Sequence, residues 1–265
     1  MFDGVKYLIF LKQKKIPLHY RWGIVEARGV DEVSEVVVAP YDEEWNTILG
    51  KRETIKVDSL AVNYGFTSRT EITQQLGCTH SYHPNRGGLK PDVDKWQRSD
   101  RQSVYTAGDA NGVYGSYVAE IEGKIAVHGY LIDSGHINES QANLSCAPLR
   151  NDLKRLIKFQ HGFNKLSSPK EGLLTLPDKE TVICRCENAT LGKIDQAIAQ
   201  GIGNITKLKM ATRAGMGDCQ GKSCGDFCHN YLVKKSGRSH VEIGNLKPRF
   251  PLAPVTFSAF AGIGE

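Results

Sequence analysis

The sequence predicts an α/β protein that ends in a small helical unit. Three observations predict this class: a β-rich stretch over residues 20–62, a strand–turn–helix unit over 104–131, and a cysteine-rich stretch with short helices over 178–236. A strand that enters a helix through a glycine-containing turn is the building block of nucleotide-binding α/β sheets. A length of 265 residues allows one large domain or two to three small ones.

Composition excludes several classes of protein. The chain is 24% charged and 40% hydrophobic with a net charge of +5, which is ordinary for a globular protein. The positive excess is modest and spread out, so it does not favour nucleic-acid binding. The sequence contains no run of about 18 apolar residues, so no transmembrane helix is predicted. The N-terminus lacks the basic region and cleavage site of a secretory signal. We expect a cytoplasmic protein, in which free cysteines are more often ligands or core residues than disulfides.

Four segments of secondary structure are predicted before residue 110. The apolar runs at residues 36–38 and 55–62 predict strands. Residues 70–76 predict a short helix closed by Gly77. Residues 104–107 predict a compact strand that ends at Gly108-Asp109.

The rest of the first 170 residues is predicted to be helices and linkers. A loop with Gly112 and Gly115 precedes a helix over 116–131, whose apolar residues recur at helical spacing. Residues 133–149 are polar and predict a linker. Residues 152–166 predict a basic amphipathic helix, and a second linker begins at residue 167. The tail at 246–265 contains prolines, which predicts an extended segment.

Five of the seven cysteines lie between residues 184 and 228. Cys184 and Cys186 form a C-x-C pair, Cys219 and Cys224 form a C-x4-C pair, and 32 residues separate the two pairs. Two short helices are predicted between the pairs, with Thr190 and Asn204 as their N-caps. Soft thiolates at paired short spacings suit zinc or an iron–sulfur cluster. Zinc sites more often use C-x2-C pairs, yet cysteine spacing alone leaves the two metals equally open.

The other cysteines and the nearby basic residues can also be explained without a metal site. Cys228 follows Cys224 by four residues on the same helix face, so it is an alternative ligand or, more simply, a core residue. Cys78 and Cys146 are isolated and are interpreted as structural. Four basic residues near the second pair could offset the charge of a thiolate-ligated cluster, or be ordinary surface charge: Lys207, Lys209, Arg213 and Lys222.

The stretch from Cys184-Arg-Cys-Glu-Asn to Asp218-Cys-Gln-Gly-Lys-Ser-Cys224 resembles the bacterioferritin-associated-ferredoxin-like [2Fe–2S] domain. The resemblance is to the version in the α-subunit family of FAD/NAD(P)-binding oxidoreductases, which includes opine oxidases, hydrogen cyanide synthase and dye-linked amino-acid dehydrogenases. It implies that Cys184, Cys186, Cys219 and Cys224 hold a [2Fe–2S] cluster.

Two further stretches resemble the same flavoproteins. Residues 57–66 resemble their second conserved strand, with Ser68 where a proline often stands, and residues 104–123 resemble their C-terminal FAD motif. The resemblance implies that the flavin contacts are Gly108, Asp109, Ser116 and Tyr117. An aspartate at a strand end can bind a sugar-like hydroxyl chain, and a helix N-terminus favours an electron-rich group.

The resemblance covers only the C-terminal part of that family. No G-x-G-x-x-G unit for the FAD pyrophosphate occurs in the 265 residues. The chain is therefore expected to be a truncated product or to need a separate N-terminal half, and to hold FAD poorly alone. The implied fold is a partial Rossmann-like two-dinucleotide-binding flavoprotein domain followed by the helical [2Fe–2S] domain.

These resemblances divide the chain into five parts: residues 1–50 as the end of an inserted nucleotide-binding domain, 51–135 as the C-terminal part of the FAD domain, 136–177 as linker and helix, 178–240 as the cluster domain, and 241–265 as the tail. The implied function is electron transfer, through FAD and the [2Fe–2S] cluster, in an amino-acid or opine dehydrogenase or oxidase complex. The implied partners are a quinone or dye-like acceptor and a substrate-oxidising flavoprotein β subunit, with possible peripheral location at the inner membrane.

Two alternatives to this function stay open. One is a stand-alone [2Fe–2S] module without flavin or catalysis, and the other is a zinc-stabilised interaction domain. No residue of the chain is predicted to be a substrate acid, base or nucleophile.

Overall fold

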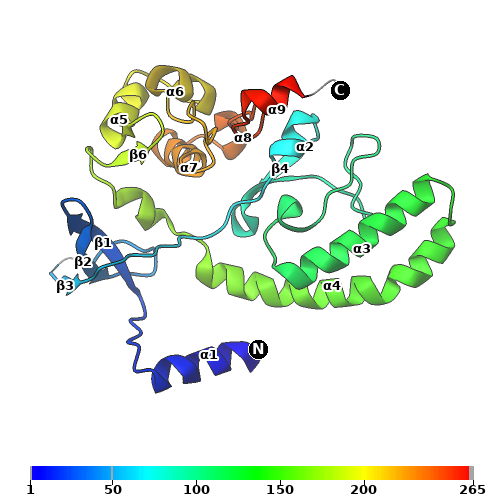
Figure 1. The fold of residues 1–265 in the computed structure, drawn as a ribbon, viewed down its shortest axis with the longest axis horizontal. Coiled ribbons are helices and arrows are strands. Elements are labelled where there is room, and N and C mark those ends of the chain that lie inside the picture. The colour runs from blue at the N-terminus through cyan, green and yellow to red at the C-terminus, as the bar shows by residue number, and fades with distance from the viewer. Residues whose placement is uncertain (1, 49, 263–265) are drawn as a thin grey trace. The chain divides into compact units, whose positions relative to one another are not determined.

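The computed structural model describes residues 2–48 and 50–262. They form two compact units: the chain up to residue 63 together with 170–176, and residues 64–169 together with the chain from 177 onward. Figure 1 labels the elements of both units. None of the described helices is long and apolar enough to cross a bilayer.

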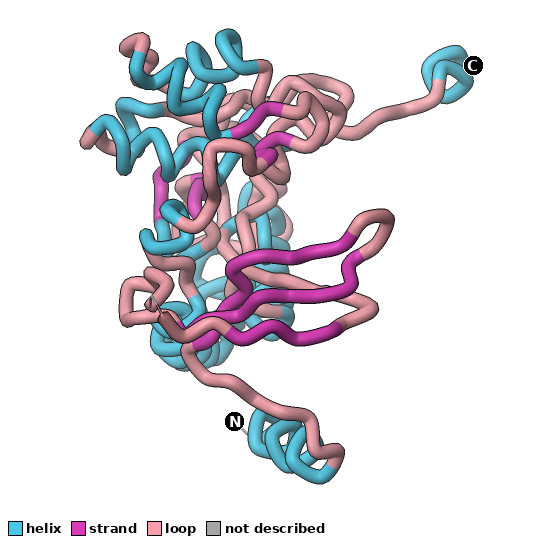
Figure 2. Tube along the Cα trace, turned by 90° about the vertical axis from the view of Figure 1, so that its left-hand side faces the viewer, coloured by secondary structure: helices cyan, strands magenta, loops and turns pink. Residues whose placement is uncertain are grey.

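The first unit holds helix α1 (Phe2–Gln13) and an antiparallel sheet of β1 (Trp22–Gly29), β2 (Val33–Pro40) and β3 (Glu53–Lys56). Strand β2 lies between the other two, as Figure 2 shows, and its Val36, Val37 and Ala39 are buried. The confirmed run at 36–38 is thus the core of this sheet. The 3-10 helix η3 (Glu171–Thr175) returns to this unit, where the Gly172 N–H donates to the Glu44 carbonyl at 2.9 Å.

The strand predicted over residues 55–62 is wrong for most of its length. Strand β3 ends at Lys56, and residues 59–70 have no regular secondary structure. A strand requires a hydrogen-bonded neighbour, and β2 pairs with β3 only as far as Lys56. Apolar alternation beyond that point therefore produces no strand among the described residues.

The second unit begins with helix α2 (Glu71–Gln75), which ends before Gly77 (φ +73°) as predicted. A hairpin of β4 (His80–His83) and β5 (Gly88–Pro91) follows, joined through the 3-10 turn η1 (Pro84–Arg86). The 3-10 turn η2 (Gly108–Asn111) then leads to α3 (Ser116–Asp133) and α4 (Glu139–Ser167). Helices α3 and α4 lie side by side, joined by a short turn (Figure 1).

The prediction of a linker over residues 133–149 is wrong, because α4 begins at Glu139. Asn138 and Gln141 form a capping box that satisfies the first free N–H groups of the helix. Ala142 and Cys146 are fully buried against Trp96 and Ile125. Ala142 and Cys146 are small and four residues apart, so they lie on one face of α4 and let it approach α3 closely. This narrow apolar face packs the helix although most of its sequence is polar.

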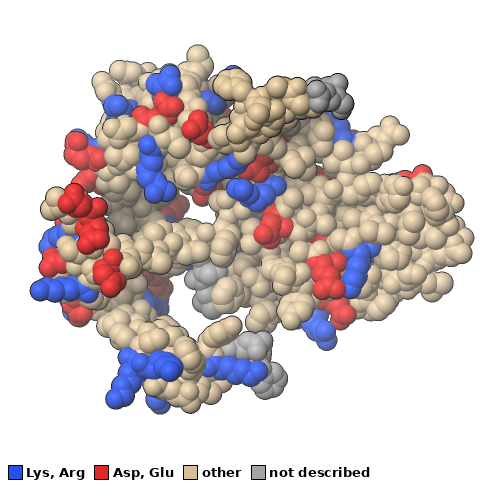
Figure 3. Space-filling model, viewed as in Figure 1, with Lys and Arg blue, Asp and Glu red and all other residues tan. Residues whose placement is uncertain are grey.

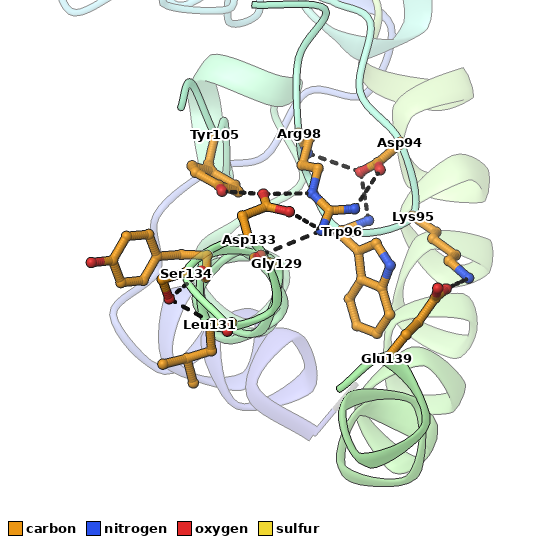
Figure 4. A network of polar contacts seen from close by, with 11 residues as sticks. Asp94, Lys95, Trp96, Arg98, Tyr105, Gly129, Leu131, Asp133, Ser134 and Glu139 are labelled. Carbon is orange, nitrogen blue, oxygen red and sulfur yellow. Dashed lines mark hydrogen bonds and ion pairs between the residues drawn. The ribbon is translucent and has the colours of Figure 1, made fainter. Parts of the chain in front are cut away.

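A polar network fixes the loop before η2 onto α3 (Figure 4). Arg98 donates to the two carboxylate oxygens of Asp133 at 2.8 and 2.6 Å and pairs with Asp94, while the Tyr105 hydroxyl donates to Asp133. The Arg98 guanidinium and the Tyr105 hydroxyl hold the pKa of the Asp133 carboxyl below its usual range. The predicted strand at 104–107 is reduced to one bridge between Tyr105 and Arg98, since no neighbouring strand lies beside it in the described chain.

The cysteine-rich part is a small helical assembly around a short hairpin of β6 (Val182–Cys184) and β7 (Ala189–Thr190). Its helices are α5 (Leu191–Ala199), α6 (Ile205–Thr212), α7 (Gly225–Ser236) and α8 (His240–Ile243). Thr190 and Asn204 cap α5 and α6 as predicted. The tail is largely irregular as expected, but it also holds α9 (Phe257–Ala261).

The hairpin β4–β5 contacts this cysteine-rich part through Tyr82. Its hydroxyl donates to Asn230 Oδ1 at 2.9 Å, and its ring stacks on His240 with centroids 3.9 Å apart. Burial raises the pKa of the Tyr82 phenol to about 12, so it stays a donor at neutral pH. This contact joins the two halves of the second unit.

Ile125→Ala tests the packing of α3 on α4. Ile125 is 1% exposed, so the change is expected to lower the free energy of unfolding by about 2–5 kcal/mol. Val127→Ala on the same helix is the matched control, because Val127 is 55% exposed and should cost less than about 1 kcal/mol. Urea unfolding followed by tryptophan fluorescence, which includes Trp96 in this core, measures both. Equal effects of the two changes would contradict the assignment of this core.

Candidate functional site

The four cysteines of the two pairs line one open cavity. It has a volume of about 390 Å³ and is lined by Cys184, Arg185, Cys186, Cys219, Ser223 and Cys224. Cys184 and Cys224 are 1% exposed, Cys219 is partly buried and Cys186 is exposed. The fold therefore brings together two cysteine pairs that are separated by 32 residues in the sequence.

Local structure explains how each pair is presented. Cys184 is the last residue of β6, and Cys186 lies in the tight turn that leads back to β7. Cys224 occupies the N-cap position of α7, and the C-x4-C loop before it turns through Gln220 and Gly221, both with positive φ. A hairpin turn and a helix start are both places where a chain can turn side chains toward a common point.

Two contacts bind the hairpin turn to the glycine-rich loop before Cys219. A Cβ on Gly217 would lie 2.2 Å from the Cys186 Cβ, so only glycine permits this approach. Glu187 directly follows Cys186, and its Oε2 accepts a hydrogen bond from Arg213 Nε at 2.6 Å. Glycine at 217 and the ion pair together set the spacing between the two cysteine segments.

Neighbouring thiols and backbone groups affect the ionisation of Cys219 and Cys224. Burial opposes ionisation of Cys219, but backbone N–H groups of Ser223 and Gly221 and the Cys186 thiol together lower its pKa. The hydrogen bond with Cys228, together with burial, raises the pKa of Cys224. A sulfur that accepts backbone N–H bonds is suited to the thiolate form that metals require.

No group of three or more His, Cys, Asp or Glu side chains in the described chain surrounds one point closely enough for a single metal ion. The four thiols flank a wider space instead. Structural zinc requires four ligands around one ion, whereas a [2Fe–2S] cluster takes two thiolates at each of two irons. Four thiols on one cavity are a donor set that a [2Fe–2S] cluster or a structural zinc could use.

Two of the four basic residues near the second pair have partners in the fold. Arg213 pairs with Glu187, and Lys222 Nζ donates to the Leu252 carbonyl at 2.5 Å. Figure 3 shows positive and negative side chains intermixed over much of the face in view.

The four residues predicted to contact flavin lie where η2 leads into α3. Gly108 is buried with φ +69°, and a Cβ there would lie 3.0 Å from the Ala119 Cβ. Asp109, Ser116 and Tyr117 are exposed, the last to 74%. Gly115, the N-cap of the 18-residue helix α3, has no atom within 4 Å of its Cβ position. The helix N-terminus is thus open to a ligand that prefers a positive dipole end.

Sequence reasoning missed the residue that holds this turn, Glu122. Its carboxylate is 3% exposed and accepts the Gly108 N–H at 2.8 Å and the Asn111 amide at 3.3 Å. Burial raises its pKa, while these two donors oppose the shift. The available signal was position: Glu122 falls between Val118 and Ile125 on the buried face of the predicted helix. A carboxylate at a core position indicates a buried hydrogen-bond network.

Two buried hydroxyl groups near the turn lack hydrogen-bond partners. The hydroxyl oxygens of Thr106 and Tyr114 are inaccessible and unpaired, although the two residues are only 4% and 6% exposed. Unsatisfied buried polar groups are rare and often belong to a ligand site. Together with the open helix start, they fit a polar cofactor at Gly108–Asn111.

Comparison with known proteins gives one family match and several relatives. Residues 178–263 match the sarcosine oxidase A3 domain, the region that contains all four cavity cysteines. The chain is 41% identical to hydrogen cyanide synthase subunit HcnB of Pseudomonas aeruginosa over 99% of its own length and 56% of that protein. It is 30% identical to an opine oxidase subunit of Rhizobium meliloti over 81% of its length and 41% of that protein.

A solved structure shares the fold. The crystal structure of L-proline dehydrogenase from P. horikoshii superposes with a TM-score of 0.71 and 21% identity, over 97% of this chain and 48% of that one. The chain thus spans about half the length of the proteins it matches. The relatives named here are subunits of a hydrogen cyanide synthase and of an opine oxidase, and residues 178–263 belong to the region that matches the sarcosine oxidase A3 domain.

Proposed function

We propose that the chain is the electron-transfer part of an α subunit in an FAD-dependent amino-acid or opine dehydrogenase or oxidase complex. Cys184, Cys186, Cys219 and Cys224 would hold a [2Fe–2S] cluster. When bound, such a cluster accepts and donates single electrons, and a flavin accepts a substrate's electron pair. The convergence of the two cysteine pairs on one cavity carries this proposal.

The chain's own residues would shape the cluster site in three ways. The N–H groups of Ser223 and Gly221 stabilise the charged form of Cys219. Hydrogen bonds to cluster sulfurs raise the reduction potential of such sites. Cys184 and Cys224 are shielded from water while Cys186 is exposed, so one edge of the site is open for an electron to leave.

The flavin site would be formed at the start of α3. Asp109 stands at the exposed end of the turn, where its carboxylate could accept hydroxyl groups of the flavin's ribityl chain. Gly108 and Glu122 keep that turn closed against α3. The G-x-G-x-x-G unit that binds the FAD pyrophosphate in such flavoproteins is not among these 265 residues, so the pyrophosphate would be bound outside them.

The partners follow from the same proposal. The named relatives are subunits of a synthase and of an oxidase, which supports a complex with other subunits. We propose that the electron donor is a substrate-oxidising flavoprotein β subunit and that the acceptor is a quinone or a dye-like molecule. The work of the complex would be done inside the cell, at or near the inner membrane.

Cys219→Ser is expected to abolish the cluster. Protein prepared without oxygen should be brown, with broad visible absorption that bleaches on reduction and about two irons per chain. The serine hydroxyl is a far weaker ligand for iron than a thiolate, so iron and colour should be lost. Iron analysis and the absorption spectrum measure this. Wild-type protein that stays colourless after reconstitution with iron and sulfide would rule out the proposed function.

Cys228→Ser is the matched control, one helical turn beyond Cys224. Cys228 contributes a hydrogen bond to Cys224, so a serine should keep both the cluster and about two irons per chain. Loss of iron equal to that in Cys219→Ser would make Cys228 a ligand and contradict the assignment.

Gly217→Ala tests how closely the two segments must approach. The added methyl group would collide with the Cys186 Cβ, so the variant should bind substantially less iron while its helices remain folded. Gly162→Ala on α4 is the control, because a Cβ there meets nothing within 4 Å and its backbone, like that of Gly217, is not in the left-handed region. Iron content and far-UV circular dichroism separate loss of the site from loss of the fold. Normal iron binding by Gly217→Ala would show that this contact does not set the site.

Asp109→Ala tests the flavin contact. The chain would be co-expressed with the part of the Pseudomonas aeruginosa subunit that it does not cover, and FAD released by heating would be measured. Loss of a hydrogen bond from a charged acceptor should weaken FAD binding on the order of tenfold. Asp152→Ala, an exposed change on α4, should leave FAD unchanged. Equal FAD retention by both variants would remove Asp109 from the site.

A further inference from the structure

A segment of the tail, residues 245–252, lies along the outer side of the C-x4-C loop. The Gln220 amide donates to the Pro251 carbonyl at 2.7 Å, and its oxygen accepts the Arg249 N–H at 2.7 Å. Lys222 Nζ donates to the Leu252 carbonyl at 2.5 Å. Residues 251 and 252 are half-buried, and the described chain after them is exposed. The ordered contact of the tail with this loop therefore ends at Leu252.

Leu246 anchors the start of the same segment in a cradle of three glycines. A Cβ on Gly215, Gly221 or Gly225 would lie 2.8, 2.4 or 3.1 Å from Leu246 Cδ1. These glycines flank Cys219 and Cys224 on both sides. Their lack of side chains makes the space that the Leu246 side chain fills, so a glycine-rich sequence here serves an apolar contact as well as a backbone turn.

The C-x4-C loop thus presents two sets of side chains to two places. Cys219 and Cys224 line the cavity. Gln220 and Lys222, which lie between them in the sequence, bind the tail. The backbone of the loop forms turn hydrogen bonds, such as Lys222 N–H to the Cys219 carbonyl at 3.1 Å. A short irregular loop gains order from contacts outside itself.

The other end of the segment is fixed through α7. His229 Nδ1 donates to the Gly244 carbonyl at 2.8 Å, and Ile243 is 1% exposed. Helix α7 begins directly after Cys224. The segment therefore contacts α7 near its start and the C-x4-C loop at its end.

We infer that residues 245–252 act as a positioning strap that holds Cys219 and Cys224 in the geometry the cluster needs. The inference rests on the proposed function, because it assigns Leu246, Gln220 and Lys222 roles toward that cluster. None of these three side chains lines the cavity, so they act through the loop rather than as ligands.

The experiment compares loosened straps with matched controls. The double change Gln220→Ala with Lys222→Met removes the polar contacts, and Leu246→Ala removes the apolar one. Lys247→Met and Val241→Ala are the controls, because Lys247 is exposed and Val241 is 87% exposed. Lys222→Arg keeps a donor that can reach the Leu252 carbonyl, so this single variant should hold the cluster as well as the wild type does.

Three measurements are made without oxygen: loss of cluster absorption in excess chelator, the electron paramagnetic resonance spectrum of the reduced cluster, and the alkylation rate of Cys219 in metal-free protein. The double variant and Leu246→Ala should lose the cluster on the order of tenfold faster than wild type, which corresponds to a free-energy difference of about 1.4 kcal/mol. Their spectra should shift or broaden, and Cys219 should be alkylated faster, while controls and Lys222→Arg match wild type.

The outcomes separate the two proposals. Equal chelation rates, spectra and alkylation in strap and control variants would overturn the strap while leaving the cluster intact. Wild-type protein that binds no cluster would overturn the proposed function, and with it the role of the strap toward a cluster. Circular dichroism checks folding. If Leu246→Ala unfolds the domain, the polar double variant still decides, because it removes only contacts between partly buried groups.

Discussion

The close approach of Gly217 to Cys186 is the contact on which the candidate cluster site depends. It places the glycine-rich loop against the turn of a hairpin, with room for no side chain between them. The Arg213–Glu187 ion pair holds the same two segments from the side. Exposed ion pairs contribute little stability alone, so the glycine contact and the buried core of the small domain carry most of this arrangement.

The two candidate cofactor sites use the same construction with different groups. At the cysteine cavity, glycines let backbone N–H groups and a leucine approach the ligand loop. At the flavin turn, a glycine packs against Ala119 and its N–H is bound by the buried Glu122. In both places the residues that would touch a cofactor are held by residues that would not. Tyr82 joins these two parts of the second unit through its contacts with Asn230 and His240.

Sequence patterns predicted the helices with caps and clear periodicity well. Thr190 and Asn204 cap their helices, and α3 begins at Ser116 as expected. The patterns failed for the strands at 55–62 and 104–107, since a strand exists only where another strand pairs with it. They also failed for the first turns of α4, where polar residues concealed a stripe of small ones. Glu122 and the tail segment were missed because their partners are distant in sequence.

The sequence by itself determined which residue types could form the site: four cysteines in two short-spaced pairs, glycines beside them, and a Gly-Asp turn before a helix. These properties are local, because spacing along the chain sets which side chains can share a turn or a helix face. Only the tertiary structure decided that the two pairs meet in one cavity and that residues 245–252 form hydrogen bonds with the loop between Cys219 and Cys224. Contacts between distant segments depend on packing and backbone hydrogen bonds that local pattern does not encode.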